Sequence, residues 1–470
     1  MSNHDSATSP RPARLPFASP TASRGQWPAP RRRRLAAIAL TMATALTAAA
    51  CSSSGGSTDA AKGPVTLTFW VKSPFPDGKV LIDQWNKLHP DIHIKLDVVS
   101  ASGNTIPQAK LLLDVKAHRE PDVAIFDTEY LPQFVTTGSV LNLNTVKDGD
   151  ASALSSKFES WAWSTVHVGD GLYGLPIDAG PLNLYYRKDL FAKYHLQVPK
   201  TMAEYVQAAE ALHKKDPSVY LADLPTNDAS VFTAMAWAAG AKPFKVKGNS
   251  WVVDIAGAES LKAAKTWQQL IDDKSVMTLP QFSSEWSQAY NTGKLASWMS
   301  AAWAPGPLKS FAPKTAGKWA VAPMPQSTPG VASSGSWGGS SAVVFKSTKY
   351  PEQALEFTKF LTTNQQVWSE YWIPKITLYP TNIDAQKSEA LSKPDSFFGG
   401  QKIYDTISAS NHSVAHDFNY GPVANEWFTT EQNYLSQAVN GKMTVAEALQ
   451  QTQKSVVSYM RKQGLSVEAP

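Results

Sequence analysis

VTLTFWVKSPFPDGKVLIDQWNKLHPDIHIKLDVV, which occupies residues 65–99, is the stretch that decides the fold class. Its first seven residues, 65–71, alternate polar and apolar side chains and are rich in β-branched and aromatic types, which predicts a strand. Residues 79–88 carry apolar side chains at helical spacing and stop before Pro90, because proline cannot continue a helix. Residues 92–99 predict a second strand, so strand, helix and strand follow one another within one short stretch.

The same alternation continues with a helix predicted over residues 108–118 and a short apolar strand over residues 121–127. Strands that alternate with helices in this way are typical of an open α/β sheet with a parallel core. Such sheets bind ligands beyond the carboxyl ends of their strands. Asp127 and Glu129 lie at the end of the third strand and are therefore candidate ligand-binding residues.

Further strands and helices are predicted along the rest of the chain. Thr201 and Glu204 have the spacing of a capping box, in which the two side chains bond reciprocally to the backbone at the start of a helix. The remaining predictions are strands over residues 182–187, 319–325 and 341–346 and helices over residues 201–215, 258–273, 351–372, 426–441 and 444–464.

The N-terminal region has the order of a secretion signal. Four arginines (31–34) precede an apolar run over residues 35–50, and Cys51 and a Ser/Gly-rich segment follow. The run is shorter than the ~20 residues that a membrane-spanning helix needs. We therefore expect residues 1–50 to be a signal peptide and residues 51–63 to be a flexible linker. The arginines fit either the general or the twin-arginine export route.

Cys51 is the only cysteine of the chain, which excludes an internal disulfide. Its setting resembles a bacterial lipoprotein signal, in which the cysteine is acylated and becomes the mature N-terminus. That interpretation anchors the protein to the outer face of the cell membrane through lipid alone. The alternative is ordinary cleavage near Ala50, which leaves a free thiol.

Charge and length restrict the folded part further. Residues 1–50 carry a net charge of +6 and the whole chain carries +5, so the remainder is close to neutral. The basic character belongs to the signal, and nucleic-acid binding, which needs a basic patch on the folded part, is not expected. The chain from Pro64 onward has about 400 residues, which suits two domains rather than one core.

A set of ordered motifs connects the chain to a known family. The stretch 170–212 contains Gly171, Tyr173, Gly174 and Pro176 and then a Tyr-x-Lys-Asp-Leu motif that begins at Tyr186. Other matching stretches, in the expected order, are EPDVAIFD (120–127), NTGKLASWMSAAWAP (291–305) and WGGSSAVVFKSTKYPEQALEFTKFLT (337–362). In these features the chain resembles the extracellular solute-binding proteins (family 1) that serve carbohydrate ABC transporters, over nearly all of residues 64–470.

The resemblance implies a periplasmic-binding-protein-like fold with two α/β lobes, a hinge crossed three times and a ligand cleft between the lobes. Lobe one is expected to comprise residues 64–175 plus 306–346, and lobe two residues 176–305 plus 347–470. The implied function is capture of a sugar or short oligosaccharide and its delivery to ABC permease subunits. The implied protein is a monomer that is not an enzyme, and closure of the two lobes traps the ligand.

A carbohydrate site needs fixed acids and amides for hydroxyl groups and flat rings beneath the sugar faces. Each candidate also has a structural interpretation: core packing for a tryptophan, helix capping for Asp127 and a hinge hydrogen bond for Asp178. We assign Trp267, Trp319 and Trp368 to the core. The candidate ligand-binding residues are Asp127, Glu129, Asp178, Trp298, Trp303, Trp337, Gly338, Trp70 and Trp427.

Other chemistries have little support in the sequence. The histidines lack metal-ligand spacing, and no P-loop, GxSxG or GxGxxG motif occurs, so no metal or cofactor is expected. Two alternatives stay open. One is a secreted glycosidase that uses two carboxylates. The other is a binding protein of the same fold for a non-sugar solute, although Arg187 is the nearest arginine to the inferred cleft and phosphorylated ligands favour arginine.

Overall fold

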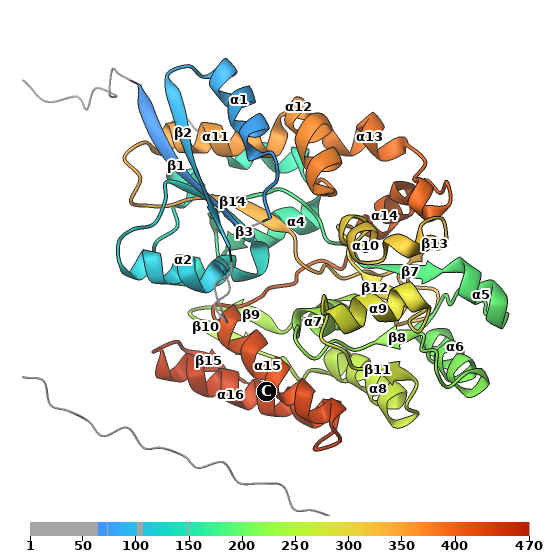
Figure 1. Cartoon of the computed structure of the whole chain (residues 1–470). Coiled ribbons are helices and arrows are strands. Elements are labelled where there is room, and N and C mark those ends of the chain that lie inside the picture. The colour runs from blue at the N-terminus through green and yellow to red at the C-terminus, as the bar shows by residue number, and fades with distance from the viewer. Residues whose placement is uncertain (1–63, 73, 101–106, 148–149, 470) are drawn as a thin grey trace, which may run out of the picture. The chain divides into compact units, whose positions relative to one another are not determined.

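The computed structural model describes residues 64–72, 74–100, 107–147 and 150–469 (Figure 1). The predicted signal peptide, the linker and Cys51 lie outside the described residues. Among the helices that the structure describes, none has both the length and the apolar character required to cross a membrane.

The first sheet is built by the alternating stretch at the start of the folded part. Three strands at one side of the sheet run parallel, as predicted, and two later strands join antiparallel to complete it. In spatial order the strands are β2 (Ile92–Val99), β1 (Val65–Lys72), β3 (Val123–Asp127), β14 (Ser340–Val344) and β6 (Leu175–Pro176). The helices associated with this region are α1 (Gly78–Leu88), α2 (Pro107–Lys116), α3 (Leu131–Thr136), α4 (Ser160–Thr165) and α11 (Pro351–Thr363).

The second sheet is antiparallel, with β7 at its centre (Figure 1). Its order is β12 (Ser297–Ser300), β7 (Asn183–Arg187) and β13 (Trp319–Pro323). Smaller sheets pair β8 (Ala222–Asp223) with β11 (Val276–Met277), β4 (His167–Val168) with β5 (Gly171–Leu172), and β10 (Ser250–Val253) with both β9 (Phe244–Lys247) and β15 (Val467–Glu468).

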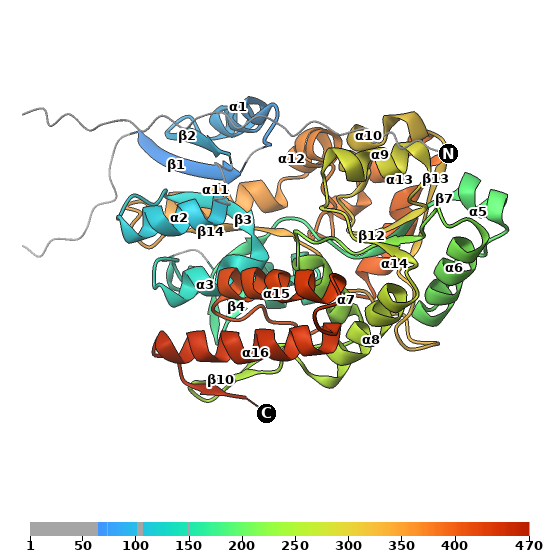
Figure 2. The same cartoon turned by 60° about the horizontal axis from the view of Figure 1, so that its bottom comes forward.

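Helices surround this second part of the molecule, and α15 packs along α16 (Figure 2). They are α5 (Lys188–Tyr194), α6 (Met202–Lys215), α7 (Ser230–Ala238), α8 (Ala258–Asp272), α9 (Ser284–Thr292), α10 (Pro305–Phe311), α13 (Glu389–Ser392), α14 (Ile403–Asn411), α15 (Ala424–Val439) and α16 (Val445–Lys462). Helix α12 (Gln365–Val367) follows α11 on the side of the first sheet (Figure 1). Short 3₁₀ helices occupy Thr128–Tyr130, Leu143–Thr145, Ser152–Lys157, Pro313–Thr315, Ala385–Lys387 and Ser396–Phe398.

Three segments connect the two main sheets, and they lie against one another. The first is 177–182 and the second is 324–339, and a backbone bridge joins Pro181 to Ser336. The third follows residue 376, and a bridge joins its Pro380 to Asp178 in the first segment. Asp178 and residues 337–339, which directly precede β14, therefore lie where the chain passes between the two sheets.

The sheet pairings differ from the predicted lobe boundaries in two places. Strand β13 was expected in lobe one, but it pairs with β7 of the second sheet. Helix α11 was expected in lobe two, but it packs against β14 and β6 of the first sheet. The reason is that the second crossing runs through 324–339, later than the sequence motifs indicate, and α11 packs beside the strand that directly precedes it.

Local capping explains where helices begin and where one prediction fails. The Thr201 side chain accepts from the backbone N–H of Glu204, as expected, while the Glu204 carboxylate accepts from the N–H of Lys200. The single helix predicted over residues 351–372 is broken at Asn364, whose side chain accepts from two following N–H groups and starts α12. A π-helix over Trp368–Ile376 then completes the segment. An asparagine side chain that bonds to nearby backbone competes with the helical bonds, and the sequence pattern did not reveal this.

Candidate functional site

A cavity of about 700 Å³ lies at the carboxyl ends of β1 and β3, beside the crossing segments. All three crossings contribute to its wall through Asp178, through residues 337–339 and through Leu378. The opposite wall is formed by the N-terminus of α7 and by one face of α15. This volume falls within the roughly 300–1,000 Å³ that small-molecule sites occupy.

The first-sheet wall presents charged groups at strand ends. Lys72, the last residue of β1, forms an ion pair with Asp127, the last residue of β3. The side-chain amide of Gln108 donates to the other oxygen of Asp127 at 2.5 Å. The carboxylate of Asp127 is therefore fixed from two sides, and a ligand hydroxyl meets acceptors whose positions are already set.

Two further carboxyl groups on this wall are almost fully buried. Burial raises the pKa of Asp178 to about 6, although the Ser340 N–H, which donates to it at 2.8 Å, acts in the opposite direction. Burial also raises the pKa of Glu129 well above its ordinary value, and the nearby charges of Asp127 and Asp228 add to this effect. Burial therefore disfavours the charged form of both carboxyl groups.

The opposite wall is organised around the start of α7. Asp228 accepts from the N–H and the hydroxyl of Ser230, at 2.9 and 2.5 Å. The Ser230 hydroxyl in turn accepts from the indole N–H of Trp337 at 2.9 Å. This chain of bonds ties the second crossing segment to the second part of the molecule and raises the rigidity of the wall.

Aromatic rings complete the cavity. Trp303 donates its indole N–H to the backbone carbonyl of Trp337 at 2.9 Å, and the two rings meet at 62° with centroids 4.7 Å apart. Phe428 of α15 contributes a further ring. Phe282 also lines the cavity, and it is 54% exposed with φ of +63°. A bulky residue rarely adopts positive φ, so this exposed ring is held in place at an energetic cost, as often occurs at functional sites.

A family profile of bacterial extracellular solute-binding proteins matches residues 75–368. The chain belongs to this family. A lactose-binding protein of Rhizobium radiobacter is 26% identical over 404 residues, which cover 82% of this chain and 90% of that protein. An arabinooligosaccharide-binding protein of Bacillus subtilis is 24% identical and covers 79% of this chain and 86% of its own length.

Solved structures agree with this assignment. The galacto-N-biose/lacto-N-biose I-binding protein of the ABC transporter from Bifidobacterium longum, in complex with lacto-N-biose, matches with a TM-score of 0.76 at 28% identity. The match covers 86% of this chain and 99% of that one. A binding protein from B. animalis subsp. lactis, in complex with β-1,6-galactobiose, gives a TM-score of 0.73 at 26% identity and covers 86% of this chain and all of that one. The solute-binding protein therefore has the periplasmic-binding-protein fold with two α/β lobes, as the motifs implied.

The structure brings six of the nine candidate residues of this solute-binding protein into one cavity. They are Asp127, Glu129, Asp178, Trp303, Trp337 and Gly338. Gly338 and Gly339 both have positive φ, at +72° and +99°, which glycine adopts readily and which lets the backbone form part of the wall.

The other three candidates lie elsewhere. Trp70 is 2% exposed within the core of the first sheet. Trp298 packs behind the cavity, with its ring centroid 6.0 Å from that of Trp303 and 6.3 Å from that of Trp337. Trp427 is 2% exposed and donates its indole N–H to Glu431 in the interior. The core assignments of Trp267, Trp319 and Trp368 are confirmed, because all three are buried.

Several cavity residues escaped the sequence analysis. Lys72 ends β1 as Asp127 ends β3, so the strand-end rule that selected Asp127 applies equally to Lys72. Phe428 is one position beyond Trp427, and the helical pattern alone did not distinguish which of the two rings faces the cavity. Gln108, Asp228, Ser230 and Phe282 lie in or beside loops, where residue type gives no comparable signal.

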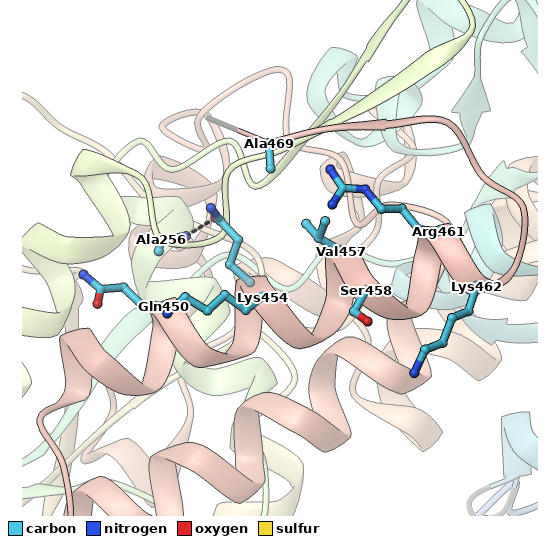
Figure 3. A pocket seen from close by; sticks show the side chains of 9 residues that line it. Ala256, Gln450, Lys454, Val457, Ser458, Arg461, Lys462 and Ala469 are labelled. Atoms are coloured by element: carbon cyan, nitrogen blue, oxygen red, sulfur yellow. Dashed lines mark hydrogen bonds between the residues drawn. The ribbon is translucent and has the colours of Figure 1, made fainter.

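A second hollow of similar volume, about 700 Å³, follows one side of α16 (Figure 3). Its wall carries Lys454, Arg461 and Lys462 beside Ala256 and Val457. It has neither the aromatic rings nor the carboxyl groups of the interlobe cavity, so we place the candidate site in the interlobe cavity. The described residues contain no cluster of three or more histidine, cysteine or carboxylate side chains suited to a metal ion.

Proposed function

We propose that this protein captures a sugar or short oligosaccharide in the interlobe cavity. The observation that carries the proposal is the combination of fixed carboxyl groups and aromatic rings within one cavity of about 700 Å³. Carboxyl groups and amides match sugar hydroxyls, and rings cover the weakly polar C–H faces. The sugars in the names of the relatives and of the solved complexes support the same ligand class.

We further propose that the protein delivers its ligand to the permease subunits of an ABC importer and does so as a monomer. In this proposal residues 1–50 are removed and Cys51 carries the lipid that anchors the protein outside the cytoplasm. A Cys51→Ser variant would then leave the membrane fraction and appear in the medium or the soluble extract. Retention of that variant in the membrane would contradict lipid anchoring.

Isothermal titration tests the binding proposal. The panel contains glucose, lactose, lacto-N-biose, β-1,6-galactobiose and arabino-oligosaccharides, with amino acids and polyols as the comparison set. We expect a saturable signal from at least one sugar and a raised Tm with the same sugar, because a ligand that binds only the folded state stabilises it. A response restricted to the comparison set would contradict sugar binding.

Two matched variants locate the site. Phe282→Ala removes an exposed ring that lines the cavity, and Leu113→Ala removes a side chain of α2 that is 58% exposed and does not line it. We expect weaker sugar binding only in Phe282→Ala. The catalytic alternative is examined with chromogenic glycosides: turnover that disappears in Asp178→Asn would replace binding with hydrolysis as the function.

A further inference from the structure

Glu129 is a buried carboxyl group in the wall of the cavity that forms no ion pair with any described residue. Its side chain lines the cavity, and the residue is only 8% exposed. Among the described residues no ion pair reaches its carboxyl group, and the side-chain hydrogen bond that lowers its pKa comes from the adjacent Tyr130 hydroxyl. A buried carboxylate without a strong partner is unfavourable, so this group is suited to a partner that arrives with the ligand.

The charged groups around Glu129 are mostly acidic. The charged and titratable groups around Glu129 are Lys72, Asp127, Asp228, Tyr130 and Tyr420. Lys72 is the one cationic side chain among the described lining residues, and it forms its ion pair with Asp127. Lys72 therefore acts on Glu129 only as a nearby charge that lowers its pKa, without an ion pair between the two side chains. The cavity has four carboxyl groups against one ammonium group, so it favours a positive charge on whatever enters.

We propose that the ligand is an amino sugar or a short oligosaccharide with a protonated amine, and that this amine is bound at Glu129. The inference rests on the proposed function, because it specifies the class of sugar for the same cavity. An ammonium group donates charge-assisted hydrogen bonds to a carboxylate, whereas a hydroxyl at the same carbon donates only a neutral one. An N-acetyl group lacks the charge, and a phosphate or carboxylate on the sugar would be repelled.

Titration with sets of sugars that differ only in their C2 substituents tests this. The first set is lactose, galactosyl-β-1,4-glucosamine and N-acetyllactosamine, and the second is cellobiose with the glucosamine β-1,4 dimer, all at neutral pH. We expect the free amine to bind roughly 10-fold more tightly than the hydroxyl or the N-acetyl form, since hydrogen bonds to charged groups are about twice as strong as neutral ones. The preference should shrink when salt is raised.

Glu129→Gln provides the matched variant, because it keeps the shape of the side chain and removes its charge. We expect this variant to bind the amine and hydroxyl members of a pair about equally, while its Tm shows that it is folded. Glu431→Gln is the control, because Glu431 is also buried but does not line the cavity. The control should keep the preference of the wild type.

The outcomes separate this inference from the proposed function. Hydroxyl sugars that bind as tightly as their amine counterparts would overturn the amine assignment and leave sugar binding intact. An amine preference that survives in Glu129→Gln would overturn the role of Glu129. If no sugar of either set or of the wider panel binds, while another solute class does, the proposed function itself fails and this inference fails with it.

Discussion

The two walls of the interlobe cavity are built on different principles. The first-sheet wall places Lys72 and Asp127 at the ends of neighbouring parallel strands, where sheet geometry fixes their spacing. The opposite wall consists of the N-terminus of α7, a face of α15 and the loop ring of Phe282. Strand ends therefore supply the Lys72–Asp127 ion pair, and helix faces and loops supply most of the aromatic contact. The comparison shows why polar candidates were easier to locate from sequence than aromatic ones.

The largest expected effect concerns α15, where the Trp427 ring lies in the core and the neighbouring Phe428 ring lines the cavity. Trp427 is buried and bonded to Glu431, so Trp427→Ala should lower the free energy of unfolding by about 3–5 kcal/mol, as expected when a large buried side chain is removed. Denaturant titration measures this. If the variant were as stable as the wild type but did not bind sugar, Trp427 would belong to the cavity and the distinction between the two rings would fail.

The pH dependence of stability tests the environment of Glu431, which is buried on α15 behind the cavity. Burial raises the pKa of Glu431 to about 8, although Trp427 and Thr233 donate to its carboxyl group. A raised pKa means that its stabilising contribution is complete below the pKa of the unfolded chain and is lost as pH rises through about 8. From pH 6 to 8 the wild type should therefore lose about 2–3 kcal/mol relative to Glu431→Gln, at about 1.4 kcal/mol per pH unit.

The measurement is the free energy of unfolding of both proteins at each whole pH unit from below to above the folded pKa of about 8. The difference between the curves should change little once the pH exceeds the folded pKa. Parallel curves across the whole range would mean that Glu431 does not titrate in this interval, and the interior of the helix wall would then be more polar than its burial indicates.

A substitution of Phe282 should have an effect of intermediate size, lowering the sugar affinity without lowering the stability. Phe282→Gly should weaken sugar binding by roughly 10-fold through loss of a ring contact. It should also keep or slightly raise the stability, because glycine adopts φ of +63° without strain and the ring is 54% exposed. Titration and thermal melting of one variant check both. A lower Tm with unchanged affinity would place Phe282 in the structural frame instead of the site.

The smallest effect is expected on the first-sheet wall, where Trp70 points into the core two positions before Lys72. Its indole nitrogen has no hydrogen-bond partner among the described residues, so Trp70→Phe removes no hydrogen bond. We expect a loss of about 1–2 kcal/mol in stability from the smaller ring and an affinity within two-fold of the wild type. A large loss of affinity would show that the core behind the strand ends sets the geometry of the polar groups.

The sequence analysis was more successful for the first-sheet wall of the cavity than for the opposite wall. The alternation over residues 65–127 correctly predicted the parallel core of the first sheet, because hydrophobic periodicity is local. The strand-end rule selected Asp127 and Glu129, which line the cavity, but it was not extended to Lys72. Trp70 and Trp427 were chosen by residue type, but both are buried in the core and do not line the cavity. A tryptophan packs in a core as readily as it stacks on a sugar face.

The sequence by itself determined the alternating α/β order, the family and the acids at the end of β3, because periodicity and ordered motifs are properties of the chain. The tertiary structure alone decided that β13 joins β7, that Phe428 rather than Trp427 lines the cavity, and that Glu129 forms no ion pair with any described residue. Pairing partners, burial and charge environment depend on residues far apart in sequence, and only the folded chain brings those residues together.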